Sequence, residues 1–412
     1  MKRKSKMTVA SLLVVVLLVP LSLGCSDDGD GGKVTITIGQ LTDFTGPGAP
    51  AIKNITYVTQ DVAKYYNDEE LIPGVRVRIA AYDTKFDPAR YPLGYEWCKM
   101  QGAGVIITII ADAAEVCKPF AERDKVVIAA MGAVEELFDP PEWVFGFSST
   151  VTESMKTLFR WVSENVWDGQ GTPRIGAVGW RDEQSMDALR AVEEYTESHP
   201  EQFDYVGGYT SPVGTMSFKM EAQKLADADC DYVAVISGYM GGFFLRDFRE
   251  AGGTARLLDC IGSIGSYRKF YADLVGWEML DGFLSTQQSL YWTDGGPIVE
   301  LLTELVHRYR SGEADAIIAG GNGYVGAGHM VVGIFEVLEQ AVAQVGAENF
   351  NGQAYFDAAL NYKTTSDMWK GYYPEYEFGP TRRCLMDHAM ISGYDAEAED
   401  YVGLSDWLLN VD

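Results

Sequence analysis

The sequence predicts the α/β fold class, with two doubly wound parallel-sheet lobes. Two observations carry this prediction. Apolar runs of strand length recur along the chain, and segments with the apolar spacing of helices separate them. The chain also has 412 residues, more than one hydrophobic core usually serves, so two lobes are expected. Strands that are connected through helices pair in parallel.

The first lobe is predicted from residue 33 to 147. Helices are expected to start near Ala51, Ala89 and Ala113. They alternate with four apolar segments that we expect to be strands: 34–39, 75–82, 104–111 and 125–131.

The second lobe is predicted to begin at residue 148, after "WVFGFSS", where the same alternation restarts. Its helices are expected around Asp187, Phe218 and Phe243. Residues 297–361 are mostly helical in pattern, and "HAMISGYD" predicts one more strand. The segments expected to be the other strands of this lobe are 174–180, 203–209, 231–237, 256–262 and 281–286.

The first 24 residues have the pattern of an export signal. Four basic residues precede an apolar stretch from Val9 to Leu23, which is the order of regions in a secretory signal peptide. As a membrane span the stretch is short, is interrupted by Pro20, and is followed by the polar "SDDGDGGK". We therefore expect residues 1–24 to be removed on export.

Cys25 follows the signal in "LSLGC", which resembles a bacterial lipoprotein box. The usual leucine three places before the cysteine is Ser22 here, and Leu21 stands one place earlier. We expect Cys25 to be the lipid anchor and residues 25–32 to be a flexible tether. Cleavage of an ordinary signal nearby remains the alternative.

The charge and the cysteines limit the class of protein. The formal net charge is −26, so nucleic acid is not an expected partner. Five cysteines besides Cys25 include no C-x-x-C, so zinc-ribbon and thioredoxin chemistry lack their minimal motif. Export permits disulfides, and the sequence leaves their pairing open.

Candidate ligand-contacting residues lie just after the predicted strands, because open α/β sheets bind ligands beyond the carboxyl ends of their strands. Phe44, Trp180 and Tyr239 occupy such positions and could cover an apolar or planar ligand. The turn "TGPG" at residues 45–48 could cradle a phosphate on its amides. Because Arg181 is the one basic residue in these loops, we interpret the turn as a pocket edge instead.

Catalytic and cofactor motifs give no positive signal. A formal G-x-G-x-x-G at Gly321, Gly323 and Gly326 lies late in the chain, outside the strand-to-helix context of a dinucleotide site. Close packing at a helix start explains these glycines better. The four histidines are scattered, and no G-x-S-x-G or H-E-x-x-H occurs. We expect no enzyme activity, no cofactor and no metal.

Several segments together resemble the type I periplasmic binding proteins, in particular the leucine/isoleucine/valine-binding branch of ABC transporter substrate-binding proteins. These are "TITIGQLTDFTGPGAP", "YYNDEELIPGVRVRIAAYDTKFDPARY" with Asp83, Asp87 and Pro88, "VVIAAMGA", and "GGYTSPVGTMSFKMEAQKLADADCDYVAVIS". The resemblance implies two lobes joined by a multi-strand hinge with an interlobe ligand cleft. It adds residues from about 287 to 384 to lobe 1, and from about 385 to 412 to lobe 2.

The resemblance also implies a function. The protein would be the extracytoplasmic solute-binding component of an ABC importer of the amino-acid or branched-chain amino-acid type, closing its cleft on a small solute. Its partners would be that solute, a membrane permease, and the membrane through the lipid anchor, and it would be a monomer. An extracytoplasmic sensor or receptor domain is the alternative, and an enzyme is a weaker one.

The resemblance also implies which residues of this chain bind the ligand, and several of them differ in type from the residues of the family. Ala111, Asp112 and Ala113 match the serine-rich loop that binds the α-carboxylate, and Gly132 and Ala133 match the loop after the fourth strand. Asp112 is our candidate for the missing ammonium partner. The positions of the two tyrosines and of the ammonium-binding glutamate of the family correspond to Gln184, Tyr239 and Ile264.

Overall fold

The computed structural model describes residues 32–236 and 238–411. Residues 34–412 form one compact unit. The predicted signal peptide, Cys25 and all of the predicted tether except Gly32 lie outside the described residues. Everything below concerns the compact unit from residue 34 onward.

The first lobe contains a parallel sheet with the strand order β2-β1-β3-β4-β5. The strands are apolar and largely buried, as expected for a sheet that is covered on both faces. Their bounds are Val34–Thr42 (β1), Val75–Asp83 (β2), Ala103–Thr108 (β3), Val127–Ala130 (β4) and Val144–Gly146 (β5).

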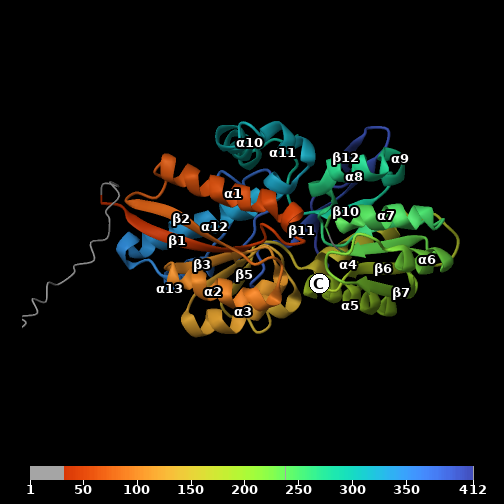
Figure 1. Ribbon diagram of the computed structural model, residues 1–412, viewed down its shortest axis with the longest axis horizontal. Coiled ribbons are helices and arrows are strands. Elements are labelled where there is room, and N and C mark those ends of the chain that lie inside the picture. Colours follow the sequence, from red (N-terminus) through yellow and green to blue (C-terminus); the bar gives the residue numbers. More distant parts are fainter. Residues whose placement is uncertain (1–31, 237, 412) are drawn as a thin grey trace, which may run out of the picture. The chain divides into compact units, whose positions relative to one another are not determined.

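Helices cover both faces of this sheet (Figure 1). On one face α1 packs against α12, and on the other α2 packs against α3. The helices are Ala49–Asp68 (α1), Tyr91–Met100 (α2), Ala111–Asp124 (α3), Pro297–Tyr309 (α10), Ala314–Gly320 (α11), Gly323–Val345 (α12) and Gly352–Ala359 (α13).

The second lobe contains a mixed sheet with the order β12-β11-β10-β9-β8-β6-β7, and β13 pairs with β11. The strands are Arg174–Trp180 (β6), Asp204–Ser211 (β7), Tyr232–Ile236 (β8), Arg256–Asp259 (β9), Leu284–Gln287 (β10), His388–Asp395 (β11), Asp400–Gly403 (β12) and Leu408–Leu409 (β13). The helices are Val151–Asn165 (α4), Glu183–Ser198 (α5), Lys219–Asp227 (α6), Met240–Glu250 (α7), Arg268–Val275 (α8) and Trp277–Leu280 (α9).

These elements confirm the predicted α/β class with two lobes. Two details differ from the prediction. β11 lies at the predicted residues 388–395 but runs antiparallel to β10, because the chain returns to this sheet directly from the other lobe, with no crossover helix of the second lobe before it. The short strands β5, β12 and β13 carry too few residues for an alternating pattern to predict them.

Three crossovers in the described chain connect the lobes, after β5, after β10 and before β11. The first and third are paired: Gly146 donates its N–H to the Arg383 carbonyl at 2.7 Å. The second is tied to the first by Gln288, whose side chain accepts the Ser149 N–H at 2.9 Å and donates to Ser154 Oγ at 2.9 Å. The crossovers therefore form the multi-strand hinge that was predicted.

The helix α12 is long and apolar enough to cross a membrane by length and composition, among the residues that the structure describes. However, 72% of its most apolar window is buried inside the fold. Val331, Phe335 and Leu338 belong to the hydrophobic core of the first lobe. We therefore describe α12 as a core helix.

Both sheets share a strand order that locates the site. In the first lobe β2 and β3 lie on opposite sides of β1, and in the second lobe β7 and β8 lie on opposite sides of β6. The pairs β1/β3 and β6/β8 are therefore switch points of the topology. Ligands of open α/β sheets bind at such points, beyond the carboxyl ends of the strands. The loops after these four strands line one cavity.

Candidate functional site

A cavity of about 240 Å³ lies between residues of the two lobes. The first lobe contributes the start of α1, the loop after β3 and residues 131–133, and the second contributes the loops after β6, β8 and β9. The crossovers add Ser148, Ser149, Gln288 and Ser289, and α12 adds its first two turns. The cavity is therefore built from segments of all parts of the compact unit.

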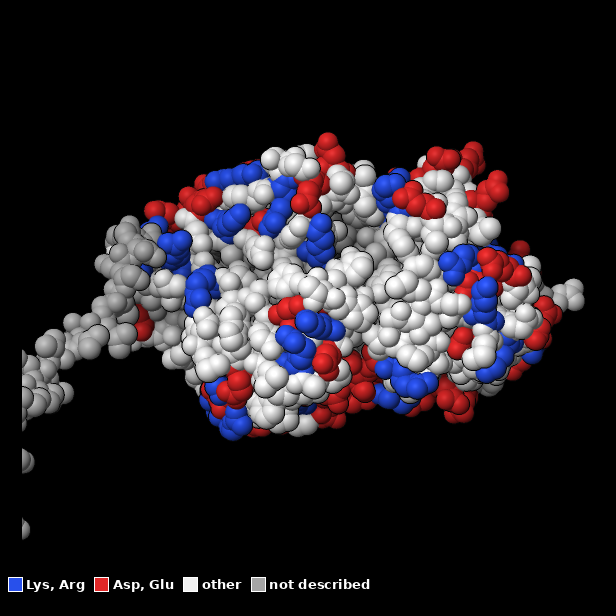
Figure 2. All heavy atoms as spheres, viewed as in Figure 1, with Lys and Arg blue, Asp and Glu red and all other residues white. Residues whose placement is uncertain are grey.

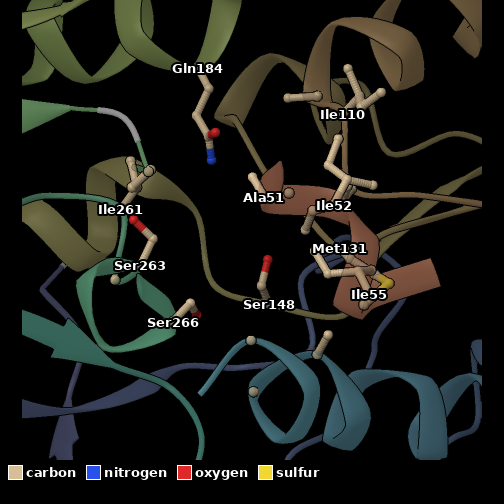
Figure 3. Close-up of a pocket in the computed structure, with 18 of the residues that line it drawn as sticks. Ala51, Ile52, Ile55, Ile110, Met131, Ser148, Gln184, Ile261, Ser263 and Ser266 are labelled. Atoms are coloured by element: carbon tan, nitrogen blue, oxygen red, sulfur yellow. The ribbon is translucent and has the colours of Figure 1, made fainter. Parts of the chain in front are cut away.

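The cavity has an apolar flank and a polar flank (Figure 3). Ile52 and Ile55 of α1 and Met131 lie on one side, and Ser263 and Ser266 lie on the other. Figure 3 also shows the Gln184 and Ser148 side chains, which extend into the space from opposite directions. The arrangement suits a ligand with one apolar face and several hydrogen-bonding groups.

The turn between β1 and α1 is held by the chain's own carboxylates. Asp43 accepts the backbone N–H groups of Thr45, Gly46 and Gly48 at 3.1, 2.5 and 2.8 Å. Asp83 at the end of β2 accepts the N–H of Phe44 at 2.9 Å. Because these amides are paired, the turn has the character of a pocket edge and lacks the free donors of a phosphate cradle.

Two half-buried carboxylates stand where the lobes meet. Asp112 in the first turn of α3 accepts the N–H of Glu183, in the opposite lobe, at 3.1 Å. Asp182 caps α5 by accepting the N–H of Ser185 at 2.7 Å. Burial raises the pKa of the Asp112 carboxyl above its usual range, and burial raises the pKa of Asp182 to about 6.

Further contacts bridge the lobes beside the cavity. The Tyr239 hydroxyl donates to the carbonyl of Pro47 at 2.6 Å, which connects the loop after β8 with the turn before α1. Asn322 at the start of α12 donates its N–H to the Gly265 carbonyl at 2.8 Å. Arg190 on α5 contacts Glu136 at 2.8 Å. The cleft is therefore closed by direct contacts between the lobes.

Most of the predicted site residues line this cavity, where their role in binding stays a prediction. They come together although they lie on separate loops of both lobes, because those loops follow the strands at the two switch points. These residues are Ala111, Asp112, Gly132, Ala133, Trp180, Gln184 and Tyr239.

The structure places two predicted residues elsewhere. Phe44 has 47% of its surface exposed and does not line the cavity; Asp43 and Asp83 fix the turn so that Phe86 lines it instead. Ile264 is 1% exposed and packs in the core of the second lobe. Its neighbours Ser263 and Ser266 line the cavity, because Asp259 binds the Ser263 and Ile264 N–H groups and sets the direction of this loop.

Sequence reasoning missed the contribution of α12. Asn322 and His329 line the cavity and are 5% and 1% exposed, and neither was among the predicted site residues. The glycines of the formal G-x-G-x-x-G provide one signal: a side chain on Gly321 would collide with the Gly265 carbonyl of the other lobe. The close-packing interpretation agrees with this contact.

The described residues contain no group of three or more His, Cys, Asp or Glu side chains arranged to hold a metal. The cysteines that the structure describes, from Cys98 to Cys384, are buried and unpaired. Burial raises the pKa of the Cys98 thiol and of the Cys117 thiol to about 12, so neither is poised as a nucleophile. The cavity thus offers hydrogen-bonding and apolar groups for binding.

Comparison with known families identifies the architecture. A family model described as "Periplasmic binding protein" matches residues 35–391. The chain belongs to the periplasmic binding protein family. A search of curated protein sequences found no match.

Solved structures of periplasmic binding proteins share this fold at low sequence identity. A branched chain amino acid ABC transporter protein from Thermus thermophilus with bound valine has a TM-score of 0.79 at 15% identity, covering 92% of this chain and 97% of its own. A solute binding protein from Rhodopseudomonas palustris BisB5 in complex with 3,4-dihydroxybenzoic acid has a TM-score of 0.72 at 16% identity, with 92% and 98% covered. A fatty acid ABC transporter substrate-binding protein from Thermomonospora curvata has a TM-score of 0.74 at 16% identity, with 91% and 92% covered.

Membership of this family implies an extracytoplasmic location. The cavity of the present chain occupies the interlobe position that the periplasmic binding protein fold was expected to provide. Because valine, 3,4-dihydroxybenzoic acid and a fatty acid, the solutes named for these three proteins, differ in charge and size, the fold leaves the solute open. The identity of the solute therefore depends on the residues that line the cavity.

Proposed function

We propose that this periplasmic binding protein is the solute-binding component of an ABC importer, which closes its cleft on a small solute and presents the loaded form to a membrane permease. The observation that carries the proposal is the cavity of about 240 Å³ at the switch points of both sheets. A cavity of about 150 Å³ accommodates benzene, so this one suits a small solute with a ring or a branched chain.

The contacts between the lobes support binding by cleft closure. Tyr239 and Pro47, and Asp112 and Glu183, join loops of opposite lobes at the rim of the cavity. In a protein that alternates between open and closed forms, such contacts form only in the closed form, and a solute that touches both lobes favours that form. A permease can then distinguish the loaded protein by its closed surface.

An amino acid, in particular a branched-chain one, is the solute that the sequence resemblance predicts. The Thermus thermophilus structure with bound valine supports this expectation. The buried Ile264 supplies no carboxylate for an ammonium group, so Asp112 would have to take that role. Valine and leucine therefore belong in the test, and Asp112→Asn should weaken their binding at least tenfold if Asp112 is the ammonium partner.

Thermal unfolding of the mature protein in the presence of a solute panel tests the proposed function. The panel contains amino acids, amides, aromatic acids, fatty acids, sugars and nucleosides. A solute at about 100 times its Kd should stabilise the protein by about 2.7 kcal/mol, and small-angle scattering should report closure. Mass spectrometry of small molecules released from protein purified from its native cells extends the panel.

We propose in addition that Cys25 carries a lipid after removal of residues 1–24. The supporting observation is the "LSLGC" sequence directly after the apolar stretch. Cys25→Ser should move the protein from the membrane fraction to the soluble extracytoplasmic fraction, while Cys98→Ser should not. Membrane association that survives Cys25→Ser would contradict the anchor.

A further inference from the structure

The chain's own carboxylates occupy backbone amides next to the cavity. Asp43 holds the turn before α1 and Asp182 caps α5. Asp112 stands in the first turn of α3. Asp259, which is buried, accepts the N–H groups of Ile261, Ser263 and Ile264 at 3.1, 2.5 and 2.9 Å in the loop after β9. Asp43, Asp182 and Asp259 therefore occupy backbone donors in three loops on the cavity side of the two sheets. Asp112 occupies the N–H of Glu183 in the first turn of α5.

This arrangement opposes an anionic ligand. Free amides at a helix N-terminus attract anions, but at α5 the carboxylates of Asp182 and Asp112 take that position. Among the described lining residues there is no Lys or Arg, while Asp112 and Asp182 both belong to the lining. A carboxylate or phosphate placed in the cavity would meet negative charge without a basic partner, in surroundings that have low dielectric.

Several buried neutral groups at the cavity lack partners. Ser263 Oγ and Asn322 Oδ1 have no hydrogen-bond partner among the described residues, and the Asn322 Nδ2 group is already used by Ser289 Oγ at 2.8 Å. The ring nitrogens of His329 are also unpaired, although the carbonyls of Val325 and Gly326 lie near the ring. Burial lowers the pKa of His329 to about 3, so its ring is neutral.

An unpaired buried acceptor such as Asn322 Oδ1 is destabilising unless a ligand donates to it. A carboxylate has no hydrogen to donate, whereas an amide or a hydroxyl does. Gln184 and Ser148 extend into the same space and can donate or accept (Figure 3). Asn322 Oδ1 is therefore complementary to a ligand that carries donors, whereas Ser263 Oγ can donate as well as accept.

We propose that the cavity selects an uncharged solute, with one apolar face that packs on Ile52, Ile55 and Met131 and with hydroxyl or amide groups that bind Asn322, Ser263 and Gln184. The inference rests on the proposed solute-binding function and specifies its substrate class. The Asp112 and Asp182 carboxylates each already accept one backbone N–H group, which leaves an ammonium group only the remaining carboxylate oxygens. Burial further penalises charge at this site.

A matched set of probes on one ring skeleton tests the class. It contains 4-hydroxybenzamide as the neutral member, 4-hydroxybenzoate as the anion and tyramine as the cation, with leucine as a zwitterion and uridine and hexanamide as further neutral probes. Calorimetric titration of the mature protein should give at least tenfold tighter binding for a neutral probe than for any charged one. Tighter binding of 4-hydroxybenzoate, tyramine or leucine would overturn the proposal.

Two variants test the proposed class by the change in affinity that each causes, so the absolute affinity of the probes does not matter. Gln184→Arg adds the basic group that the lining lacks, so it should raise the affinity for 4-hydroxybenzoate relative to 4-hydroxybenzamide at least tenfold. Asn322→Ala should weaken the best neutral probe about 3- to 10-fold, the range for one hydrogen bond. Gln223→Ala, which removes an exposed glutamine paired with Asp227 on α6, is the control and should change neither.

The outcomes separate this inference from the proposed function. A charged solute that closes the cleft overturns the inference and supports the importer role. If no probe binds, the charge of the small molecule released from natively purified protein decides the class. The absence of any bound or released solute would contradict both.

Discussion

At the scale of single residues, Asp61 shows how one buried charge fixes the cavity side of the first lobe. Its carboxylate is fully buried within α1 and receives two N–H groups of Arg310 at 2.7 and 2.8 Å and the Tyr324 hydroxyl at 3.0 Å. Arg310 lies just after α10, and Tyr324 is in the first turn of α12. The cluster therefore holds together the two helices that line the cavity from this lobe.

Removal of this charge should destabilise the protein strongly. Asp61→Asn leaves the Arg310 guanidinium without its carboxylate, which for a buried pair costs about 3–5 kcal/mol. Urea denaturation followed by circular dichroism measures the free energy of unfolding.

The matched control is Glu313→Gln, because the Lys53–Glu313 pair joins α1 to the same region at 3.1 Å but is more than half exposed. An exposed pair contributes about 0.2–1 kcal/mol. Equal losses in the two variants would show that burial of the Asp61 cluster is not what stabilises this contact.

At the scale of elements, the N-terminus of α5 combines a helix cap with an acid of raised pKa. Asp182 accepts the Ser185 N–H, and burial raises the pKa of its carboxyl to about 6 from the ordinary 3.8. The native chain therefore binds a proton at this position more readily than the unfolded chain. Stability contributed by the protonated acid is present at low pH and is lost as the pH rises through about 6.

Asp182→Asn tests this dependence, because asparagine is also a good helix N-cap but does not titrate. Between about pH 7.5 and pH 5, the wild type should gain on the order of 1–2 kcal/mol of unfolding free energy relative to the variant. The measurement is urea denaturation of both proteins at both pH values. The opposite contribution of His329, whose pKa is lowered, is the same in both proteins and cancels. Parallel pH profiles would contradict the prediction.

At the scale of the whole molecule, two lobes close around one cavity, and charge is dispersed over the surface. Figure 2 shows Lys and Arg scattered among Asp and Glu on the face in view, in keeping with the acidic net charge of −26. The closed form depends on a few contacts between the lobes, of which the Tyr239 hydroxyl and the Pro47 carbonyl form one at 2.6 Å.

Tyr239→Phe should therefore shift the equilibrium toward the open form. One lost hydrogen bond of about 0.5–1.5 kcal/mol predicts an about 2- to 13-fold faster dissociation of the bound solute, measured by stopped-flow fluorescence with the solute found in the panel. Tyr205→Phe is the control, because Tyr205 lies at the start of β7 and does not line the cavity. This variant should leave the dissociation rate unchanged. An unchanged rate in Tyr239→Phe would mean that this contact does not hold the cleft closed.

Much of the site was predictable because its position follows from the fold class. Trp180 and Tyr239 were predicted from the rule that loops after parallel strands line the ligand site, which depends on the order of elements alone, and Gln184 from the family resemblance; all three line the cavity, and their role in binding stays a prediction. Phe44, predicted from the same rule, and Ile264, predicted from the resemblance, do not line the cavity. The direction of each side chain within its loop depends on the Asp43, Asp83 and Asp259 hydrogen bonds, which local patterns do not encode.

The sequence by itself determined the α/β class, the two lobes and the set of loops that meet at the cavity, because apolar periodicity and chain order are local properties. Only the tertiary structure decided that internal aspartates fill the amide sites and that Asn322 and His329 of α12 reach the cavity. The Asp112–Glu183 and Asn322–Gly265 contacts join residues of different lobes, whose meeting no local pattern specifies. The character of the cavity is therefore a property of the folded chain.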